Sequence, residues 1–258
     1  MTVVQKKSDL HRLQGEAYIT KIIAGENPKD NLRYCGNLKS LTTKMTLSRT
    51  PHKETVTGNN RIDDQITSQT QITLSFSFED ISKENFALAC QAATNTITAA
   101  TVTGETHTVG GPDTAFALAK NHLLTFTSLT KGGGGSGSLV LGTDYIAKPA
   151  SNIIYIPTGS SLIAGDEVTA SYTTAATEEI LPFAATEEYY YLVFDGINTQ
   201  NGKKPFFFEA FKMQFNVLQQ LELIGDNYVE LLIDAECLYD ISNDSGDSEY
   251  GGYIRIVK

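Results

Sequence analysis

Carboxylates are the residues of this sequence whose spacing could support chemistry, and the clearest set follows one strand-like segment. Within residues 226–240, DNYVELLIDAECLYD, the acidic side chains Glu230, Asp234 and Glu236 share one parity, and the opposite parity is apolar. Alternation with period two predicts a strand with one buried face and one acidic face. We interpret this pattern first as a structural feature: the strand belongs to a sheet whose acidic face meets water or a negatively charged molecule.

Adjacent carboxylate pairs offer a second kind of chemistry, because glycoside hydrolysis needs two carboxylates at a suitable separation. Such pairs occur at positions 63–64, 178–179 and 187–188. A sugar site usually adds aromatic platforms, and the chain has no Trp, although it has 12 Tyr. We interpret the pairs as solvated charge, and we expect a protein that is not an enzyme.

The sequence contains no motif with the residue spacing of a metal-binding or phosphate-binding site. The four histidines, at positions 11, 52, 107 and 122, have no ligand spacing, and no nucleophile-elbow motif is present. In the glycine-rich run, Lys131 precedes the glycines, whereas a phosphate loop places Lys after them. The acidic segment from Asp240 fails the EF-hand pattern, since Ser245 and Gly251 stand where Gly and Glu belong. We expect no metal and no cofactor.

Composition favours a β-rich chain. The 258 residues are 41% hydrophobic and rich in Thr, Ser, Gly, Ile and Phe, which favour strands and turns. The net charge is −10, and residues 181–258 alone hold thirteen acidic and five basic residues, which argues against nucleic-acid binding by charge neutralisation. The three cysteines, an odd number at wide spacing, predict reduced core thiols. With no long apolar run, we expect no secretion signal and no membrane span.

A long hairpin with a polar arm is predicted in the first third of the chain. Strand-like alternation covers 16–23, 38–47 and 72–78, and the polar interval 48–69 contains a Gly-Asn-Asn turn signal. This arm cannot bury itself, so we expect it to be mobile or placed against another molecule. Its candidate contact residues are His52, Lys53, Glu54, Gly58, Asn59, Arg61, Asp63 and Asp64.

The remaining elements suggest an inserted module. A helix is predicted over 82–92, capped by Asp80 or Ser82. Strands are predicted over 187–195, 203–217 and 227–239. Between them, residues 100–180 form a Thr-, Ala- and Gly-rich set of short strands, which predicts a small β module inserted into a discontinuous domain of residues 1–99 and 181–258.

The order and spacing of these pieces resembles the major tail tube proteins of long-tailed bacteriophages. The resemblance covers about two thirds of the chain, and no single segment of it is a sharp motif. The segments that carry it are YCGNL at 34–38 with the strand to Leu47, the arm with Thr57-Gly58, Ile72–Phe78, the helix from Ser82, YYYLVFDGIN at 189–198, GKKP at 202–205, Phe207–Val217 and the closing DNYVELLIDAECLYD.

This resemblance implies a mainly β fold of the tail-tube type, a β-sandwich or barrel with one short helix, long hairpins and an inserted module that faces outward. It implies a structural virion protein, made and assembled in the host bacterial cytoplasm, whose copies form stacked hexameric rings and a hollow tail tube. Its partners would be itself and the tape-measure, tail-terminator and baseplate proteins. Duplex DNA would pass without specific binding along a lumen lined by Glu230, Asp234 and Glu236, while the polar arm would reach the neighbouring ring.

Two alternatives stay open. The same features fit a tube component of a phage-derived secretion or bacteriocin particle. From a different class, they fit a carbohydrate- or cell-surface-binding β module, whose binding surface would comprise Tyr189–Tyr191 and residues 100–180.

Overall fold

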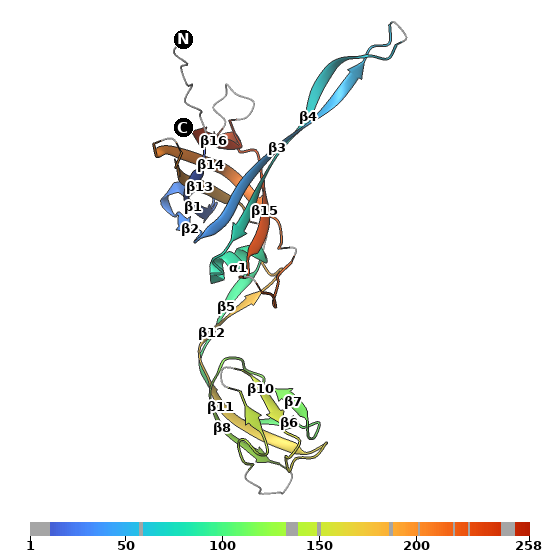
Figure 1. Ribbon diagram of the computed structural model, residues 1–258, viewed down its shortest axis with the longest axis vertical. Coiled ribbons are helices and arrows are strands. Elements are labelled where there is room, and N and C mark those ends of the chain that lie inside the picture. Colours follow the sequence, from blue (N-terminus) through green and yellow to red (C-terminus); the bar gives the residue numbers. More distant parts are fainter. Residues whose placement is uncertain are drawn as a thin grey trace, which may run out of the picture. The chain divides into compact units, whose positions relative to one another are not determined.

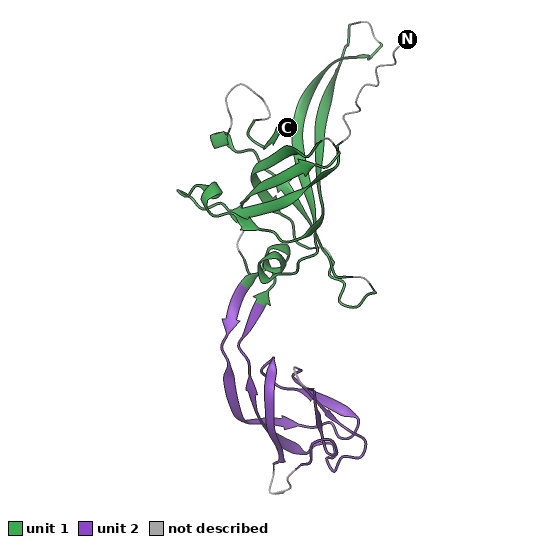
Figure 2. Ribbon diagram, turned by 60° about the vertical axis from the view of Figure 1, so that its left-hand side comes forward, with its two compact units in different colours: residues 1–93, 180–258 green, residues 94–179 purple. Residues whose placement is uncertain are grey.

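The computed structural model confirms a mainly β fold (Figure 1). It describes residues 11–56, 59–132, 139–148, 151–185, 188–200, 202–218, 220–226, 228–243 and 251–258. The chain divides into two compact units, residues 1–93 with 180–258 (unit 1) and residues 94–179 (unit 2) (Figure 2). The boundaries expected from the sequence fell after residues 99 and 180.

Unit 1 contains an eight-stranded sheet in the order β2-β1-β13-β14-β15-β4-β3, with β16 also paired to β14. All of these neighbours run antiparallel. The strands are β1 (Leu13–Lys21), β2 (Arg33–Tyr34), β3 (Leu38–Lys53), β4 (Ile62–Phe78), β13 (Tyr190–Asn198), β14 (Lys204–Phe215), β15 (Leu231–Cys237) and β16 (Ile254–Val257).

The sheet curves around its own core. Alternating residues of β4 and β15, such as Phe76 and Ile233, point into one apolar cluster, as their period-two patterns predict. The same cluster includes Ala17 and Ile19 of β1, although three strands separate β1 from β4 in the sheet order. One face of the sheet therefore wraps the core, and the other face meets solvent or smaller covering segments.

Helix α1 (Lys83–Ala89) closes one side of this core, and it is the only α-helix in the described chain. Ser82 caps it, as expected, by accepting a hydrogen bond from the Asn85 backbone N–H at 3.2 Å. The helix ends earlier than predicted because Gln91 has a left-handed backbone (φ 46°), and its side chain donates to the Phe215 carbonyl at 2.8 Å. In the described chain no helix has the length and apolar character of a membrane span.

The β3–β4 hairpin is longer than the expected strands. Pairing continues past Leu47 to Lys53 and resumes at Ile62, with register shifts at three points. The polar arm is thus a two-stranded ladder over most of its length rather than an irregular loop.

Strand β15 has an unexpected main partner. The resemblance to tail tube proteins implies that the strands at 203–217 and 227–239 form one of the long hairpins, but β14 and β15 pair only through Met213–Phe215 and Ala235–Cys237. The whole of β15 pairs with β4, and β16 covers β14 at Phe207–Ala210. Because a long segment connects β14 and β15, the two strands can diverge. Their pairing is therefore determined by packing in the core and not by a tight turn.

Unit 2 contains two three-stranded sheets, β6-β11-β8 and β7-β10-β9, around a second apolar cluster. A ladder of β5 and β12 forms where the chain enters and leaves this unit. The strands are β5 (Ala93–Ile97), β6 (Ala100–Thr108), β7 (Thr114–Ala117), β8 (Leu123–Lys131), β9 (Ile146–Ala147), β10 (Ile153–Ile156), β11 (Glu167–Thr174) and β12 (Thr177–Leu181). The alternation in this module also predicts a strand at 138–141, but its described part forms none, and Leu141 makes only an isolated bridge. Most of the glycine-rich run lies outside the described residues.

Candidate functional site

The acidic face predicted for the strand at 227–239 is confirmed by the burial of β15. Leu231, Ile233 and the other residues of their parity are buried, while Asp234 and Glu236 are exposed. Glu230, just before the strand, is partly buried. We call Glu230, Asp234 and Glu236 the carboxylate row. Its position in an assembled tube stays a prediction.

The three carboxylates differ in how their charges are compensated. Glu230 forms an ion pair with Lys39 (Nζ to Oε1, 2.5 Å) and accepts a hydrogen bond from Ser77 at 2.9 Å. The hydrogen bond from Lys39, followed by that from Ser77, lowers the pKa of Glu230 below its usual value. Asp234 instead accepts from the Ser75 hydroxyl at 2.5 Å, and Glu236 accepts from the Gln71 amide at 3.3 Å. The charges of Asp234 and Glu236 therefore meet neutral donors in the described chain.

Small hydroxyl side chains extend this face across the neighbouring strands. Ser75 of β4 lies opposite Asp234 and has Thr42 of β3 on its other side. Two residues away on the same face of β4, Thr73 lies between Glu236 of β15 and Lys44 of β3. The face is thus hydroxylated and acidic, with Lys44 as a cation and exposed Leu232 (63%) within it, and part of it lines a pocket together with the segment between β14 and β15. Such a surface repels phosphate anions more than it binds them.

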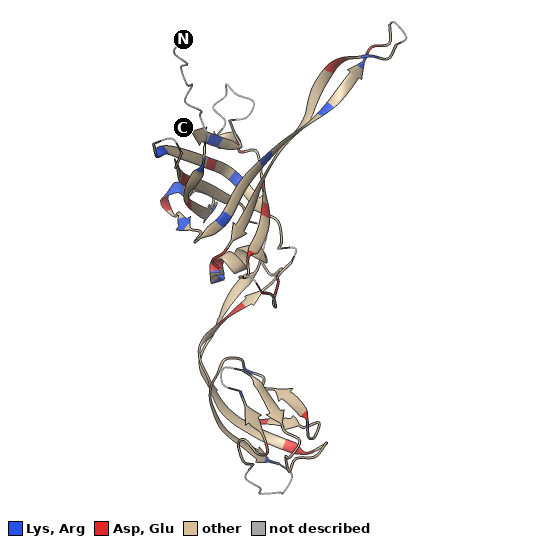
Figure 3. Cartoon of the chain, in the orientation of Figure 1, with Lys and Arg blue, Asp and Glu red and all other residues tan. Residues whose placement is uncertain are grey.

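The described arm residues are exposed except Glu54, and two of them form a pair. His52 Nδ1 lies 2.6 Å from Asp63 Oδ1, and this hydrogen bond raises the pKa of His52 and lowers that of Asp63. Asp64 accepts from the Gln65 backbone at 2.7 Å. Figure 3 shows charged residues along the hairpin as far as it is described. Of the other arm residues predicted, Lys53, Asn59 and Arg61 are exposed, Glu54 is partly buried, and Gly58 lies outside the described residues.

Apolar residues on the arm were missed at the sequence level. Val56 is 93% exposed, and Ile66 and Ile62 of β4 are 67% and 54% exposed. The register shift between His52 and Lys53 falls between the two isoleucines, so each is an exposed apolar residue among the charges of the arm. In the sequence, these exposed apolar residues were indicated only by the isolated Ile residues, Ile62 and Ile66, within the polar interval 48–69.

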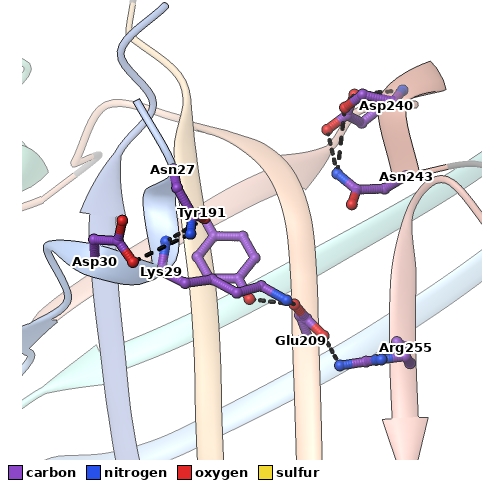
Figure 4. A network of polar contacts seen from close by, with 9 residues as sticks. Asn27, Lys29, Asp30, Tyr191, Glu209, Asp240, Asn243 and Arg255 are labelled. Carbon is purple, nitrogen blue, oxygen red and sulfur yellow. Dashed lines mark hydrogen bonds and ion pairs between the residues drawn. The ribbon is translucent and has the colours of Figure 1, made fainter. Parts of the chain in front are cut away.

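A fully buried carboxylate on β14 was also missed (Figure 4). Glu209 has 0% exposure, and the Tyr191 hydroxyl and Lys29 Nζ (2.9 Å) both donate to its Oε1. Its Oε2 has no hydrogen bond of good geometry among the described residues and relies on the charge of Arg255, 2.6 Å away. We call these four residues the Glu209 network.

Local structure places the two cations of this network. Lys29 lies in the 3₁₀ turn η1 (Pro28–Asp30), where Asn27 caps the turn by accepting from the Lys29 N–H at 3.2 Å. Arg255 comes from β16, which pairs with β14 at Glu209 itself. Burial raises the pKa of Glu209, but the hydrogen bonds from Tyr191 and Lys29 and the charges of both cations outweigh burial, so its pKa lies below the usual value.

The tyrosines suggested as a sugar-binding surface do not form an open platform. Tyr191 is 2% exposed and belongs to the Glu209 network. Tyr190 is half-buried, packs edge-on against Phe215 and donates to Glu188 at 2.7 Å. Tyr189 is 37% exposed, with Lys212 Nζ 4.2 Å from its ring centre.

Within the described residues, no three His, Cys, Asp or Glu side chains gather as a metal site. Cys35, Cys90 and Cys237 are free thiols, and burial raises the pKa of Cys35 and of Cys237 to about 12. Asp240 accepts hydrogen bonds from Ser242 and Asn243 at the turn η2 (Ile241–Asn243), so its carboxylate is used locally.

A protein-family comparison places the chain in a family. The family model described as "Protein of unknown function UCP028589" matches residues 11–257, and the chain belongs to that family. No curated protein matches the chain.

Proposed function

We propose that this member of the family is a structural, self-assembling subunit, whose copies form stacked hexameric rings and the hollow tail tube of a long-tailed phage. The β3–β4 hairpin is the observation that carries the proposal. From Thr42 to Lys53 and from Ile62 to Gln69 every residue is exposed, so this part of the ladder buries no side chain in its own chain. Two-stranded hairpins are marginal by themselves in water, because ordering them costs conformational entropy that burial must offset.

Copies of the same chain are suitable partners for such a hairpin. The hairpin has the apolar residues Ile62 and Ile66 and charges of both signs, so it can combine burial with partner selection. Its length would let it span from one ring to the next. The long edge of β3, the last strand in the sheet order, would also be protected by a ring neighbour.

The carboxylate row supports a lumen that DNA passes without binding. Duplex DNA has one negative charge per roughly 1.7 Å of its axis, so a basic lining would hold it through counterion release. Asp234 and Glu236 are exposed and bonded to neutral donors, so their charges would repel the duplex.

In this proposal the subunit has no catalytic activity, and residues 94–179 face outward from the tube. It would assemble in the host bacterial cytoplasm, become part of the virion tail, and contact tape-measure, tail-terminator and baseplate proteins. A phage-derived secretion or bacteriocin tube would use the same surfaces. The carbohydrate- or cell-surface-binding alternative has less support in unit 1, since Tyr191 is buried and Tyr190 is half-buried.

A shortened arm tests the proposal. Replacing residues 49–68 by Asn-Gly would join Ser48 to Gln69, which are register partners, through a two-residue hairpin turn. We expect this variant to unfold at the wild-type temperature, because the removed ladder buries nothing, but to form no stacks in sedimentation and electron microscopy. Stacking equal to that of the wild-type chain would contradict the role of the arm.

A further inference from the structure

Unit 1 has a groove of mixed polar and apolar lining at the gap between the two sides of its curved sheet. The groove encloses about 660 Å³ and is lined by residues of β1, β3, β13, β14 and β16. Phe194, Phe206 and Phe208 are its aromatic residues. Three further apolar residues line it and remain well exposed: Leu13 (40%), Met45 (57%) and Ile256 (47%). These side chains give the groove apolar surface that a partner can bury.

The groove is also electropositive. Its lining contains two cations, Arg12 and Lys39, and no carboxylate. Lys39 is paired with Glu230 of the same chain, so exposed Arg12 is the cation that would select a partner.

The segment between β14 and β15 presents matching side chains. Leu223, Ile224 and Tyr228 are 82%, 94% and 95% exposed. The segment is nevertheless anchored, because Leu218 and Leu221 pack against the core of unit 1. Residues 216–230 contain three acidic side chains and no Lys or Arg. We call Leu223, Ile224 and Tyr228 the apolar loop residues.

We infer that the apolar loop residues of one copy dock in the groove of a second copy. The fit combines burial of large apolar side chains with attraction between the acidic loop, through Glu222 or Asp226, and Arg12 at the groove. The groove meets β14 at Phe206 and Phe208, near its start, whereas the loop follows its end at Phe215. One chain thus offers two different, complementary surfaces.

Different surfaces on one chain produce a heterologous contact, which repeats from copy to copy and yields closed rings or open stacks. The inference deepens the proposed function and rests on it, since it names the surfaces through which copies associate.

Two variants separate the surfaces. Leu223→Ser with Ile224→Ser removes the loop contact, and Arg12→Glu with Met45→Glu blocks the groove. All four positions are exposed, so both proteins should keep the wild-type unfolding temperature. Leu124→Ser, at a residue of unit 2 that is 70% exposed, is the matched control. We expect each loop substitution to raise the dissociation constant about tenfold or more, and the control to leave it unchanged.

Mixing provides the decisive measurement, by sedimentation velocity of the full chain. Each variant alone should be monomeric where the wild type associates. An equimolar mixture should form one-to-one heterodimers and stop there, because one partner keeps an intact groove and the other an intact loop. A loop variant that associates like the wild type, or a mixture without heterodimers, overturns the inference and leaves the proposed function standing. A wild-type chain that never associates overturns both.

Discussion

Removal of the Glu209 carboxylate is the most informative perturbation of unit 1. Glu209→Ala leaves the buried Tyr191 hydroxyl without its acceptor and leaves Lys29 and Arg255 without their shared anion. These groups connect the turn η1 and strand β16 to the centre of β14. The variant therefore tests whether one buried charge fastens two peripheral segments to the sheet.

The expected cost follows from the exposure of each partner. A hydrogen bond to a charged acceptor contributes about 1.5–3 kcal/mol. The Lys29 and Arg255 side chains are 52% and 55% exposed, so water screens them and each ion pair contributes at most about 1 kcal/mol. Relief of the buried carboxylate's desolvation offsets part of this loss. We expect Glu209→Ala to lower the free energy of unfolding by about 2–3 kcal/mol, and Glu209→Gln by less, because its amide oxygen still accepts from Tyr191.

Thermal unfolding, followed by circular dichroism and calorimetry, measures these changes. For a domain the size of unit 1, about 2–3 kcal/mol corresponds to a Tm lower by roughly 5–10 °C. Lys29→Ala with Arg255→Ala should cost more than the two single substitutions together, because it leaves Glu209 charged, buried and without a cation. Glu209→Gln in that background should restore part of the stability.

The pH dependence has a defined sign. The folded-state pKa of Glu209 lies below its usual value, so its contribution is present above the unfolded pKa, near about 4.3, and is lost as pH falls through the folded value. The stability difference between wild type and Glu209→Gln should therefore shrink in acid. A difference that is constant from pH 7 to acid, together with no rescue in the double-variant background, would refute this account of the network.

Three further predictions concern the exposed surfaces and the thiols. In a filter-binding assay, assemblies of the Glu230→Lys/Asp234→Lys variant should retain duplex DNA at low salt and release it as the salt concentration rises. Wild-type assemblies should retain no DNA. If both behave alike, the carboxylate row does not line the lumen. The His52 pKa, measured by NMR titration, should lie above its usual value and return toward it in Asp63→Asn. The contact therefore stabilises the arm below the unfolded His52 pKa of about 6.5 and is lost as pH rises through the folded His52 pKa, or falls through the folded Asp63 pKa; an unchanged titration in the variant would contradict the pairing. Cys35, fully buried with its pKa raised to about 12, should react with a thiol reagent only on unfolding, and rapid labelling of the native protein would contradict this burial.

The parts of the fold that could be predicted from sequence are those set by local patterns. The period-two alternation around Asp234 placed one face of β15 in the core and the other in solvent. Ser82 marked the start of α1, because a short hydroxyl side chain satisfies the free N–H groups of a first helical turn. The end of α1 was less predictable, since Gln91 leaves the helix toward a carbonyl of β14, 124 residues away in sequence.

No local sequence pattern predicted the contacts between residues far apart in the chain. Glu209 stands among phenylalanines, and its cations come from Lys29 and Arg255, which only the folded sheet brings together. The arm beyond Leu47 has little hydrophobic alternation, so the sequence indicated its exposure but not its continuous pairing. β15 pairs mainly with β4 and not with β14. The long segment between β14 and β15 contains no tight turn that would fix the partner or the register of β15, so the sequence could not predict this pairing.

Self-association of the wild-type chain tests the central claim most directly. The purified full-length protein should be concentrated, left to stand and examined by negative-stain electron microscopy, with sedimentation velocity on the same sample. The account predicts rings and hollow stacked tubes that increase with concentration and show sixfold end views. A chain that stays monomeric at every concentration and forms no tube would contradict it.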